Sequence, residues 1–344
     1  MALVRFYKPT LRRRDMDAVL QTMVDEKIGP GERRKQFLKL MAEYLGLKDG
    51  IAVRSYTDAL KAAITALCLE SGDSIAVSVL SPEIYRTVIN DLGYKMVLLD
   101  ISSEDGCISS SEAIKAEGEG AKAIILHEPL SQLPVNFREG ALNIPVIEDI
   151  TQSIGSEYGK LKAGMTGSIV VCALEEESLI STGGGAVVLA KKSEYIEQIK
   201  KFARRYDPFF ELADMNAALG IVQLVNCEEN LKKRRELFNM FSQAAMKSDV
   251  KQFGMRNLDF LSSGYNFPLI ANSRPDDVIT FAAKYSISVK RSFTQTVGIA
   301  FQDKFDLYPN AVIPLSRGVS FPLYPFLQPK ETETIIKVLS HLPQ

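Results

Sequence analysis

The sequence is poor in the residues that hold metals or form disulfides. Its 344 residues include two histidines, His127 and His341, and four cysteines, none of them in a Cys-x-x-Cys pair. Zinc sites are built mainly from closely spaced cysteine and histidine ligands, and a Ser-His-Asp triad also needs a histidine. We therefore expect no metal site, no disulfide framework of a secreted protein and no hydrolase triad.

An excess of either charge sign and long apolar runs are missing as well. Lys and Arg total 41, Asp and Glu total 42, and the net charge is −1. A nucleic-acid-binding protein usually has a strong basic excess, so we expect no nucleic-acid partner. The longest apolar runs, such as residues 168–174, are far shorter than the ~20 residues that span a bilayer, and the N-terminus lacks a secretory signal. These absences predict a cytoplasmic protein with no membrane partner.

What the sequence does contain is a series of short Val- and Ile-rich runs between residues 51 and 190. Strands buried on both faces of a sheet give such continuous apolar runs, and amphipathic helices lie between several of them. This alternation predicts an α/β domain with a mostly parallel sheet covered by helices. The seven predicted strands are Ile51–Val53, Ser74–Val79, Met96–Leu99, Ala123–Leu126, Val146–Ile147, Ile169–Ala173 and Ala186–Leu189.

Helices are expected on both sides of this block, and the pattern changes after about residue 250. Apolar residues spaced by three and four predict helices over Asp15–Val24, Phe37–Leu45, Thr57–Leu69 and Tyr195–Ala203, and one long helix from Met215 to about Ala245. Beyond them, strands Tyr265–Ile270 and Ile287–Val289 and helices Pro275–Lys284 and Pro329–Leu342 predict a smaller α+β unit. We therefore predict a large domain over 1–245 and a small C-terminal domain over 246–344.

Four segments, in order along the chain, carry a family resemblance. They are IAVRSYTDAL at 51–60, VIEDITQSIGSEYG at 146–159, NAALGIVQL at 216–224 and VSFPLYPFLQPKETETIIKVL at 319–339. Together they resemble the DegT/DnrJ/EryC1/StrS sugar aminotransferases, which have the type I fold of pyridoxal-phosphate enzymes with a seven-stranded sheet. The resemblance implies a homodimer that transfers an amino group to a keto sugar carried on a nucleotide.

The resemblance also implies which residues would meet the cofactor. Asp149 matches the carboxylate that keeps the pyridine nitrogen protonated, and Gln152 matches a residue near the ring hydroxyl. Thr57 is kept where the phosphate meets a helix N-terminus, but the glycine expected before it is Tyr56, whose ring would crowd the ligand. Taken as bare residues, a strand-end aspartate and a Ser-x-Thr segment are also ordinary turn and helix caps.

The lysine that would form the covalent imine with the cofactor is missing. With one residue deleted in the glycine run, Ser178 takes the lysine position, and without the deletion Glu177 takes it. No lysine lies between Lys162 and Lys191, and neither a hydroxyl nor a carboxylate can form an imine. The serine that contacts the phosphate in the family becomes Ala173, or Cys172 in the other register.

A further departure lies in the segment that would reach across the dimer. Where the family has an asparagine and an arginine, this chain has Phe209 and Glu211. A phenylalanine cannot donate a hydrogen bond to a phosphate, and a glutamate repels one.

These departures leave two hypotheses. In the first, the chain is a catalytically degenerate homologue that keeps the scaffold as a homodimer, or beside a paralogous aminotransferase, binds a sugar nucleotide and uses no cofactor. In the second, it is an active enzyme that holds pyridoxal phosphate, or its pyridoxamine form, noncovalently or uses a non-standard residue.

Overall fold

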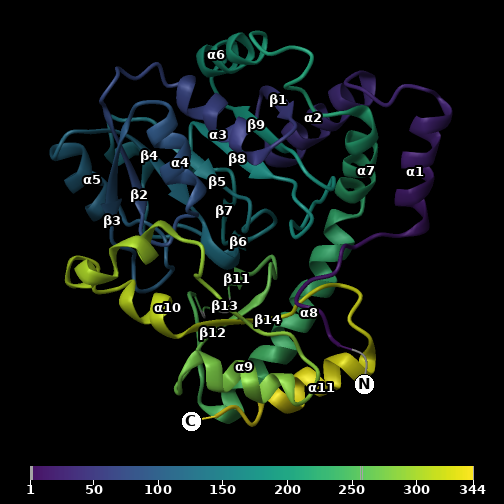
Figure 1. The fold of residues 1–344 in the computed structure, drawn as a ribbon, viewed down its shortest axis with the longest axis vertical. Coiled ribbons are helices and arrows are strands. Elements are labelled where there is room, and N and C mark those ends of the chain that lie inside the picture. Colours follow the sequence, from purple (N-terminus) through teal and green to yellow (C-terminus); the bar gives the residue numbers. More distant parts are fainter. Residues whose placement is uncertain (1–2, 256, 258, 344) are drawn as a thin grey trace.

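A seven-stranded sheet lies at the centre of the larger part of the molecule in the computed structural model, which describes residues 3–255, 257 and 259–343 (Figure 1). Its strands are β1 (Asp49–Val53), β2 (Ser74–Ser78), β3 (Lys95–Leu99), β4 (Ala121–His127), β5 (Val146–Asp149), β8 (Ile169–Ala173) and β9 (Ala186–Ala190). The strand order is β1-β9-β8-β5-β4-β2-β3, and only the pairings made by β9 are antiparallel. All seven predicted strands and the mostly parallel sheet are confirmed.

Helices cover both faces of this sheet because its strands bury apolar side chains on both sides. One face packs against α3 (Tyr56–Thr65), α4 (Ile84–Asp91) and α6 (Ser193–Ala203). The other packs against α2 (Glu32–Leu45), α5 (Ser110–Gly118) and α7 (Asp214–Val225). The predicted three-layer arrangement is therefore present, and α1 (Arg13–Val24) lies outside it, alongside α7 (Figure 1).

The long helix predicted from Met215 to about Ala245 is wrong, because the segment forms two helices. The first is α7 and the second is α8 (Cys227–Ala245), and Asn226 separates them. The Asn226 side chain donates a hydrogen bond from Nδ2 to the Val222 carbonyl at 2.8 Å, and its backbone has left the helical region. Asparagine side chains form such local hydrogen bonds readily, and here the bond accompanies the end of α7. The apolar periodicity continues across Asn226, so it predicted one helix instead of two.

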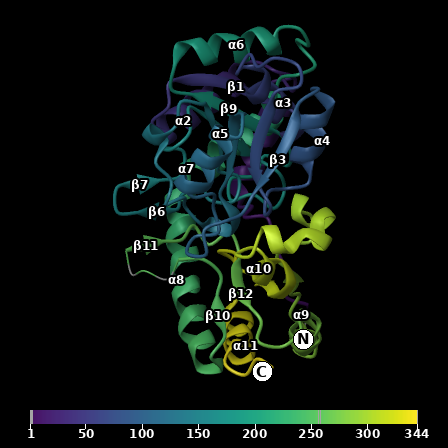
Figure 2. The ribbon, with the colours of Figure 1, turned by 90° about the vertical axis from the view of Figure 1, so that its left-hand side faces the viewer.

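A smaller part follows, joined to the larger one by α8 (Figure 2). Its sheet has the order β10-β12-β14-β13, from β10 (Lys251–Gln252), β12 (Phe267–Ile270), β13 (Lys290–Arg291) and β14 (Gly318–Phe321). Against it lie α9 (Pro275–Ala283), α11 (Pro329–Leu339) and the second half of α8. The remaining elements are β6 (Glu157–Tyr158), β7 (Leu161–Lys162) and β11 (Phe260–Leu261), which form a small sheet, α10 (Val312–Arg317), and 3-10 turns at Pro129–Ser131, Glu139–Ala141, Met246–Ser248 and Val297–Leu307.

The strand predicted at Ile287–Val289 is displaced, because the sheet ladder begins at Lys290. Ile287 instead forms an isolated bridge with Val4, and both side chains are buried in the core of the smaller part. The segment Ile287–Val289 is therefore apolar because it is buried, not because it pairs in the sheet. That core thus draws on both ends of the chain and on Phe241 of α8, and the boundary at 245/246 stays a prediction.

Candidate functional site

Three strand ends meet at one edge of the large sheet. His127 is the last residue of β4, Asp149 the last of β5 and Ala173 the last of β8, and His127 is paired in register with Asp149. In α/β sheets, ligands bind beyond the carboxyl ends of the strands. The N-terminus of α3, which follows β1, also opens onto this edge and carries Tyr56 as its first residue.

The buried Asp149 carboxylate is surrounded by donors from its own chain. Its Oδ2 accepts hydrogen bonds from the hydroxyls of Tyr56 and Tyr85. Its Oδ1 accepts bonds from the Thr151 backbone N–H at 2.9 Å and from Thr151 Oγ1 at 2.5 Å. A carboxylate has about four lone-pair positions, and four donors use them here.

Burial keeps the two phenols in the donor state. It raises the pKa of Tyr56 and of Tyr85 well above their ordinary value, and the nearby Asp149 carboxylate raises both further. Tyr85 is fully buried on α4, and its ring meets His127 edge-on with the centroids 6.2 Å apart. Asp149, Tyr56, Tyr85 and His127 thus form one packed polar cluster.

A cavity of about 450 Å³ lies beside this cluster, between the large sheet and β13 and β14. Its lining is mostly polar and includes His127, Gln152, Glu177, Tyr265, Asn266, Lys290 and Thr296. Three buried polar atoms in that lining have no hydrogen-bond partner among the described residues, namely His127 Nδ1, Asn266 Oδ1 and Thr296 Oγ1. Buried polar groups are normally paired, so unpaired atoms in this lining favour a polar ligand, which would reach them after a small movement of these buried side chains.

The buried His127 is uncharged at neutral pH. Burial lowers its pKa to about 4, although the Asp149 carboxylate opposes the shift. A neutral imidazole offers one donor and one acceptor. It therefore presents a hydrogen-bonding group rather than a charge to the cavity.

The other residues predicted from the sequence take several positions around the edge. Gln152 lines the cavity, and its Oε1 accepts a bond from the Leu130 N–H at 2.9 Å. The Ala173 N–H donates to Thr151 Oγ1 at 2.9 Å, which ties β8 to the Asp149 cluster. Thr57 is the second residue of α3 and half-buried.

The turn after β8, where the resemblance expects a lysine, presents an acidic side chain. Glu177 lines the cavity, whereas Ser178 is not part of the lining and donates its N–H to the Glu175 carbonyl at 3.0 Å. Opposite, Lys290 of β13 places Nζ 3.8 Å from Glu177 Oε1 and 4.6 Å from the centre of the Phe6 ring. Nothing in the local sequence around Lys290, Asn266 or Thr296 marked them as site residues, because each reaches the site from another part of the fold.

Of the two residues predicted to change the segment that would reach across a dimer, Glu211 is bound within its own chain and Phe209 is exposed to solvent. Glu211 is held within its own chain by an ion pair to Arg34 at 3.0 Å, whereas the Phe209 side chain is 81% exposed.

Two buried carboxylates, Glu128 and Glu148, lie next to the strand ends: Glu128 directly follows β4, and Glu148 precedes Asp149 in β5. Glu148 accepts backbone N–H bonds from Gly164, Thr166 and Gly167 at 2.7, 2.8 and 2.5 Å. Glu128 accepts a bond from the Ser153 hydroxyl, and burial together with Glu148 raises its pKa well above the usual value. Glu128 is thus the partner that holds the proton, and the pair is part of the support beneath the site.

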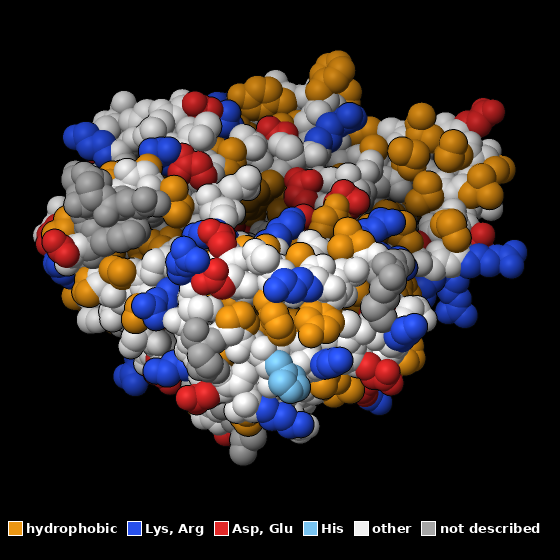
Figure 3. Space-filling model, turned by 60° about the horizontal axis from the view of Figure 1, so that its bottom comes forward, with side chains coloured by type: hydrophobic (Ala, Val, Ile, Leu, Met, Phe, Trp, Pro, Cys, Tyr) orange, Lys and Arg blue, Asp and Glu red, His pale blue; other side chains and the backbone are white. Residues whose placement is uncertain are grey.

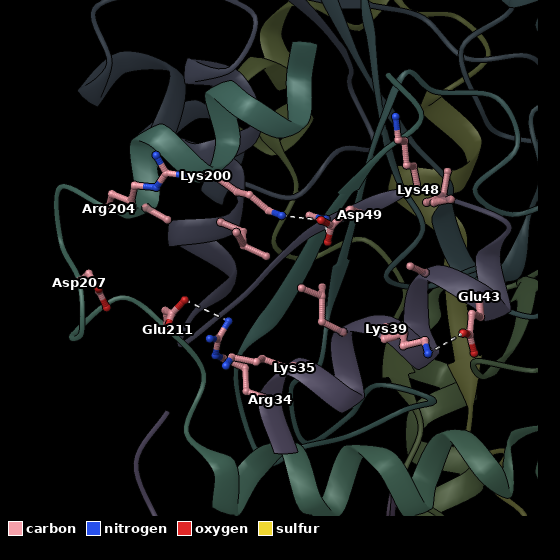
Figure 4. A pocket seen from close by; sticks show the side chains of 16 residues that line it. Arg34, Lys35, Lys39, Glu43, Lys48, Asp49, Lys200, Arg204, Asp207 and Glu211 are labelled. Carbon is pink, nitrogen blue, oxygen red and sulfur yellow. Dashed lines mark hydrogen bonds and ion pairs between the residues drawn. The ribbon is translucent and has the colours of Figure 1, made fainter. Parts of the chain in front are cut away.

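A second cleft, of about 550 Å³, opens at the far end of β1 (Figure 4). Three of its cations are already paired: Arg34 with Glu211, Lys39 with Glu43 at 3.8 Å, and Lys200 with Asp49. This internal compensation makes it a weaker ligand site than the cavity beside Asp149. Over the described ranges, His, Cys, Asp and Glu form no group of three that could hold a metal ion, and no helix is both long and apolar enough to cross a membrane.

Comparison with known proteins gives a family match over nearly the whole chain. The model of the DegT/DnrJ/EryC1/StrS aminotransferase family matches residues 9–340. The chain is 25% identical to a UDP-4-amino-4,6-dideoxy-N-acetyl-beta-L-altrosamine transaminase of Campylobacter jejuni, over 72% of this chain and 70% of that protein. It is 26% identical to a GDP-perosamine synthase of Caulobacter vibrioides, over 68% of each.

Solved structures confirm the fold. A putative sugar aminotransferase of Streptococcus pneumoniae in its PMP form superposes with a TM-score of 0.88 at 18% identity, over 98% of this chain and 97% of that one. The E. coli GDP-4-keto-6-deoxy-D-mannose-3-dehydratase with bound hydrated PLP gives 0.87 at 17% identity, over 98% and 100%. The aminotransferase fold expected from the sequence is therefore present.

Pyridoxal phosphate does not fit the site as its side chains are arranged. Its ring nitrogen would need Asp149, whose oxygens already accept four hydrogen bonds. The Tyr56 side chain extends from the α3 N-terminus, where a phosphate would bind, to that same carboxylate.

Proposed function

The chain belongs to the DegT/DnrJ/EryC1/StrS aminotransferase family, and we propose that it is a catalytically degenerate member that serves nucleotide-sugar or surface-polysaccharide metabolism as a binding subunit. The relatives named above act in the chemistry of nucleotide-linked sugars, which supports this setting. Chemistry is assigned by the site rather than by the fold, so the residues around Asp149 decide the proposal.

The presence of Glu177 in the cavity lining carries the proposal. A carboxylate has no nitrogen with which to attack a carbonyl, so the covalent step of the family has no nucleophile at this turn. An alternative amine in the cavity lining, on Lys290, lies 3.8 Å from the Glu177 carboxylate and comes from β13 rather than from this turn.

The remaining cavity supports binding of a sugar-bearing ligand. Its volume of about 450 Å³ is in the range of small-molecule sites, and its three unpartnered polar atoms match a ligand rich in hydroxyl groups. A nucleotide sugar is the ligand class that the family suggests, with the sugar in this cavity.

The proposed assembly is a homodimer, with a paralogous aminotransferase as the other candidate partner. On α1, Met16, Leu20, Met23 and Val24 are 54–68% exposed, and hydrophobic side chains gather on the right of the molecule, where α1 lies (Figure 3). Large exposed apolar patches mark protein interfaces. The place of action, in the cytoplasm, stays a prediction.

The decisive experiment is reduction with borohydride after incubation with pyridoxal phosphate, followed by digestion and mass spectrometry. We expect no lysine peptide that carries the reduced cofactor, in the wild type or in Lys290→Met. An adduct on Lys290 that disappears in Lys290→Met would support the second hypothesis, an active enzyme with a relocated amine. An adduct on any lysine in the site would contradict the degenerate reading.

Ligand binding is tested separately by calorimetric titration with UDP-N-acetylglucosamine and GDP-mannose. Thr296→Val removes an unpartnered hydroxyl from the cavity, so it should weaken binding without lowering stability. Thr334→Val is the control: Thr334 is a half-buried residue of α11 whose hydroxyl bonds to the Lys330 carbonyl at 2.7 Å, outside the cavity lining, and its substitution should leave binding unchanged. Equal binding by wild type and Thr296→Val would contradict the assignment of the cavity.

A further inference from the structure

Tyr56 connects two points that are far apart in the sequence. It is the first residue of α3, directly after the N-cap Ser55, whose Oγ accepts a bond from the Asp58 N–H at 3.1 Å. From that helix N-terminus its side chain reaches Oδ2 of Asp149 at the end of β5. One phenol therefore extends from a natural anion-binding position to a buried carboxylate.

We propose that Tyr56 is a built-in occupant of the cofactor position, so that its ring takes the volume and the Asp149 hydrogen bond that a pyridine ring would take. The inference deepens the proposed function, on which it rests, because it gives the physical reason why the site works without pyridoxal phosphate. It concerns a side chain of this protein and the ligand class it excludes, phosphorylated pyridines.

Hydrogen bonds from the protein itself fill the acceptor positions of Asp149 that a pyridine nitrogen would use. Tyr85 donates to the same Oδ2, and Thr151 supplies both donors to Oδ1. The acceptor positions of the buried carboxylate are thus filled by neutral donors of the protein without a ligand, as buried polar groups require. A pyridinium could bind only after Tyr56 had left, exposing the apolar face that its ring now buries against the core of the large domain.

The position of Tyr56 also explains how a cavity persists beside a filled site. The cavity lining includes Gln152 and His127 but not Tyr56, Tyr85 or Asp149. Asp149 and its two phenol partners thus lie outside the cavity lining. Ligand binding in the cavity and cofactor binding at Asp149 become separate properties.

The experiment measures pyridoxal-phosphate binding directly, by equilibrium dialysis and by the visible absorption of the bound cofactor. Tyr56→Gly removes the ring, and we expect it to bind the cofactor noncovalently, at least about tenfold more tightly than the wild type. Tyr56→Phe keeps the ring and removes only the hydroxyl, so it should still exclude the cofactor while its thermal midpoint falls.

Tyr94→Gly is the matched control. Tyr94 is a half-buried tyrosine in the same apolar cluster, but its hydroxyl bonds to the Leu69 carbonyl at 3.3 Å and does not face Asp149. Its removal should lower stability without creating cofactor binding. Circular dichroism and gel filtration establish that each variant is folded before binding is compared.

The outcomes separate the two proposals. Equal binding by the wild type and Tyr56→Gly would overturn the inference, as would binding by Tyr56→Phe that matches Tyr56→Gly. A folded Tyr56→Gly that binds nothing would overturn it too, while leaving the degenerate-enzyme proposal standing. If Tyr56→Gly does not fold, Tyr56→Ala replaces it as the variant without the ring. Tighter cofactor binding by Tyr56→Ala than by both the wild type and Tyr56→Phe would support exclusion by the ring. Equal binding by all three proteins would overturn the inference.

Discussion

Lys290 Nζ lies 3.8 Å from Glu177 Oε1, so an ion pair joins the turn after β8 to strand β13 of the smaller sheet. The carboxylate lies on the turn where the family resemblance expects an amine, and the amine comes from the other side of the cavity. The pair has no net charge and places no nucleophile on the turn.

This pair should stabilise the protein weakly and in a salt-dependent way. Both side chains are about half exposed, and such pairs contribute at most about 1 kcal/mol. A double-mutant cycle of Glu177→Gln and Lys290→Met in urea should give a favourable coupling that fades in 1 M salt because the charges are screened.

Lys192 provides the control for that cycle, because it also lies 3.8 Å from a carboxylate, that of Glu194, and 6.0 Å from the centre of the Tyr195 ring. Its partners are local in the sequence, so its coupling should not depend on contact between the larger and smaller parts. A Glu177–Lys290 coupling of zero at low salt would show that the charges are not held together.

Acidification should destabilise the protein through His127. Its folded-state pKa is about 4, against about 6.5 in the unfolded chain, so the unfolded state binds the proton first as the pH falls. The contribution of neutral His127 to the free energy of unfolding is complete above about pH 6.5. It is lost as the pH falls through the folded-state pKa, and the total loss is about 3 kcal/mol. Urea unfolding of the wild type and His127→Gln between pH 7.5 and 4 measures the difference.

His341→Gln, at an exposed site, is the control for the substitution itself and should leave the free energy of unfolding at pH 7.5 unchanged. Other buried carboxyl groups titrate in the same range but contribute equally to all three proteins. A His127→Gln profile parallel to that of the wild type would contradict the lowered pKa.

The carboxylates Glu128 and Glu148 should respond oppositely to amide substitution. The raised pKa of Glu128 means that the unfolded chain loses its proton before the folded one, so this group costs stability as the pH rises above about 4.5. Glu128→Gln, which resembles the protonated acid, should therefore raise the urea midpoint at pH 8 and change it little at pH 4.5.

Glu148→Gln should lower the urea midpoint at both pH values. The Glu148 carboxylate accepts three backbone N–H bonds, and an amide would leave at least one buried donor unpaired, at a cost of about 1–3 kcal/mol. Equal effects of the two substitutions would mean that the proton is not held by Glu128.

The exposed face of α1 should determine the oligomeric state. Leu20→Glu places a charge in the middle of that apolar face, and we expect it to convert a dimer into a monomer in light scattering. Ile114→Glu, on α5, is the control, because this residue is similarly exposed and lies away from α1. A Leu20→Glu protein that remains dimeric would place the interface elsewhere.

Apolar periodicity was sufficient to predict the layers of the fold. Val- and Ile-rich runs predicted every strand of the large sheet, because strands covered on both faces must be apolar throughout. It was insufficient where a local bond decided the backbone, as at Asn226, or where burial did not coincide with ladder pairing, as at Ile287.

By itself, then, the sequence determined the α/β architecture, the position of Asp149 at a strand end and the lack of a lysine after β8. Tertiary structure alone decided that the Tyr56 phenol reaches Asp149, that Glu177 rather than Ser178 lines the cavity, and that Lys290 faces it. The physical reason is that burial patterns are local properties of a chain and leave a periodic trace. A hydrogen bond between residues of different elements depends on where the fold brings them, and it leaves no trace in either local sequence.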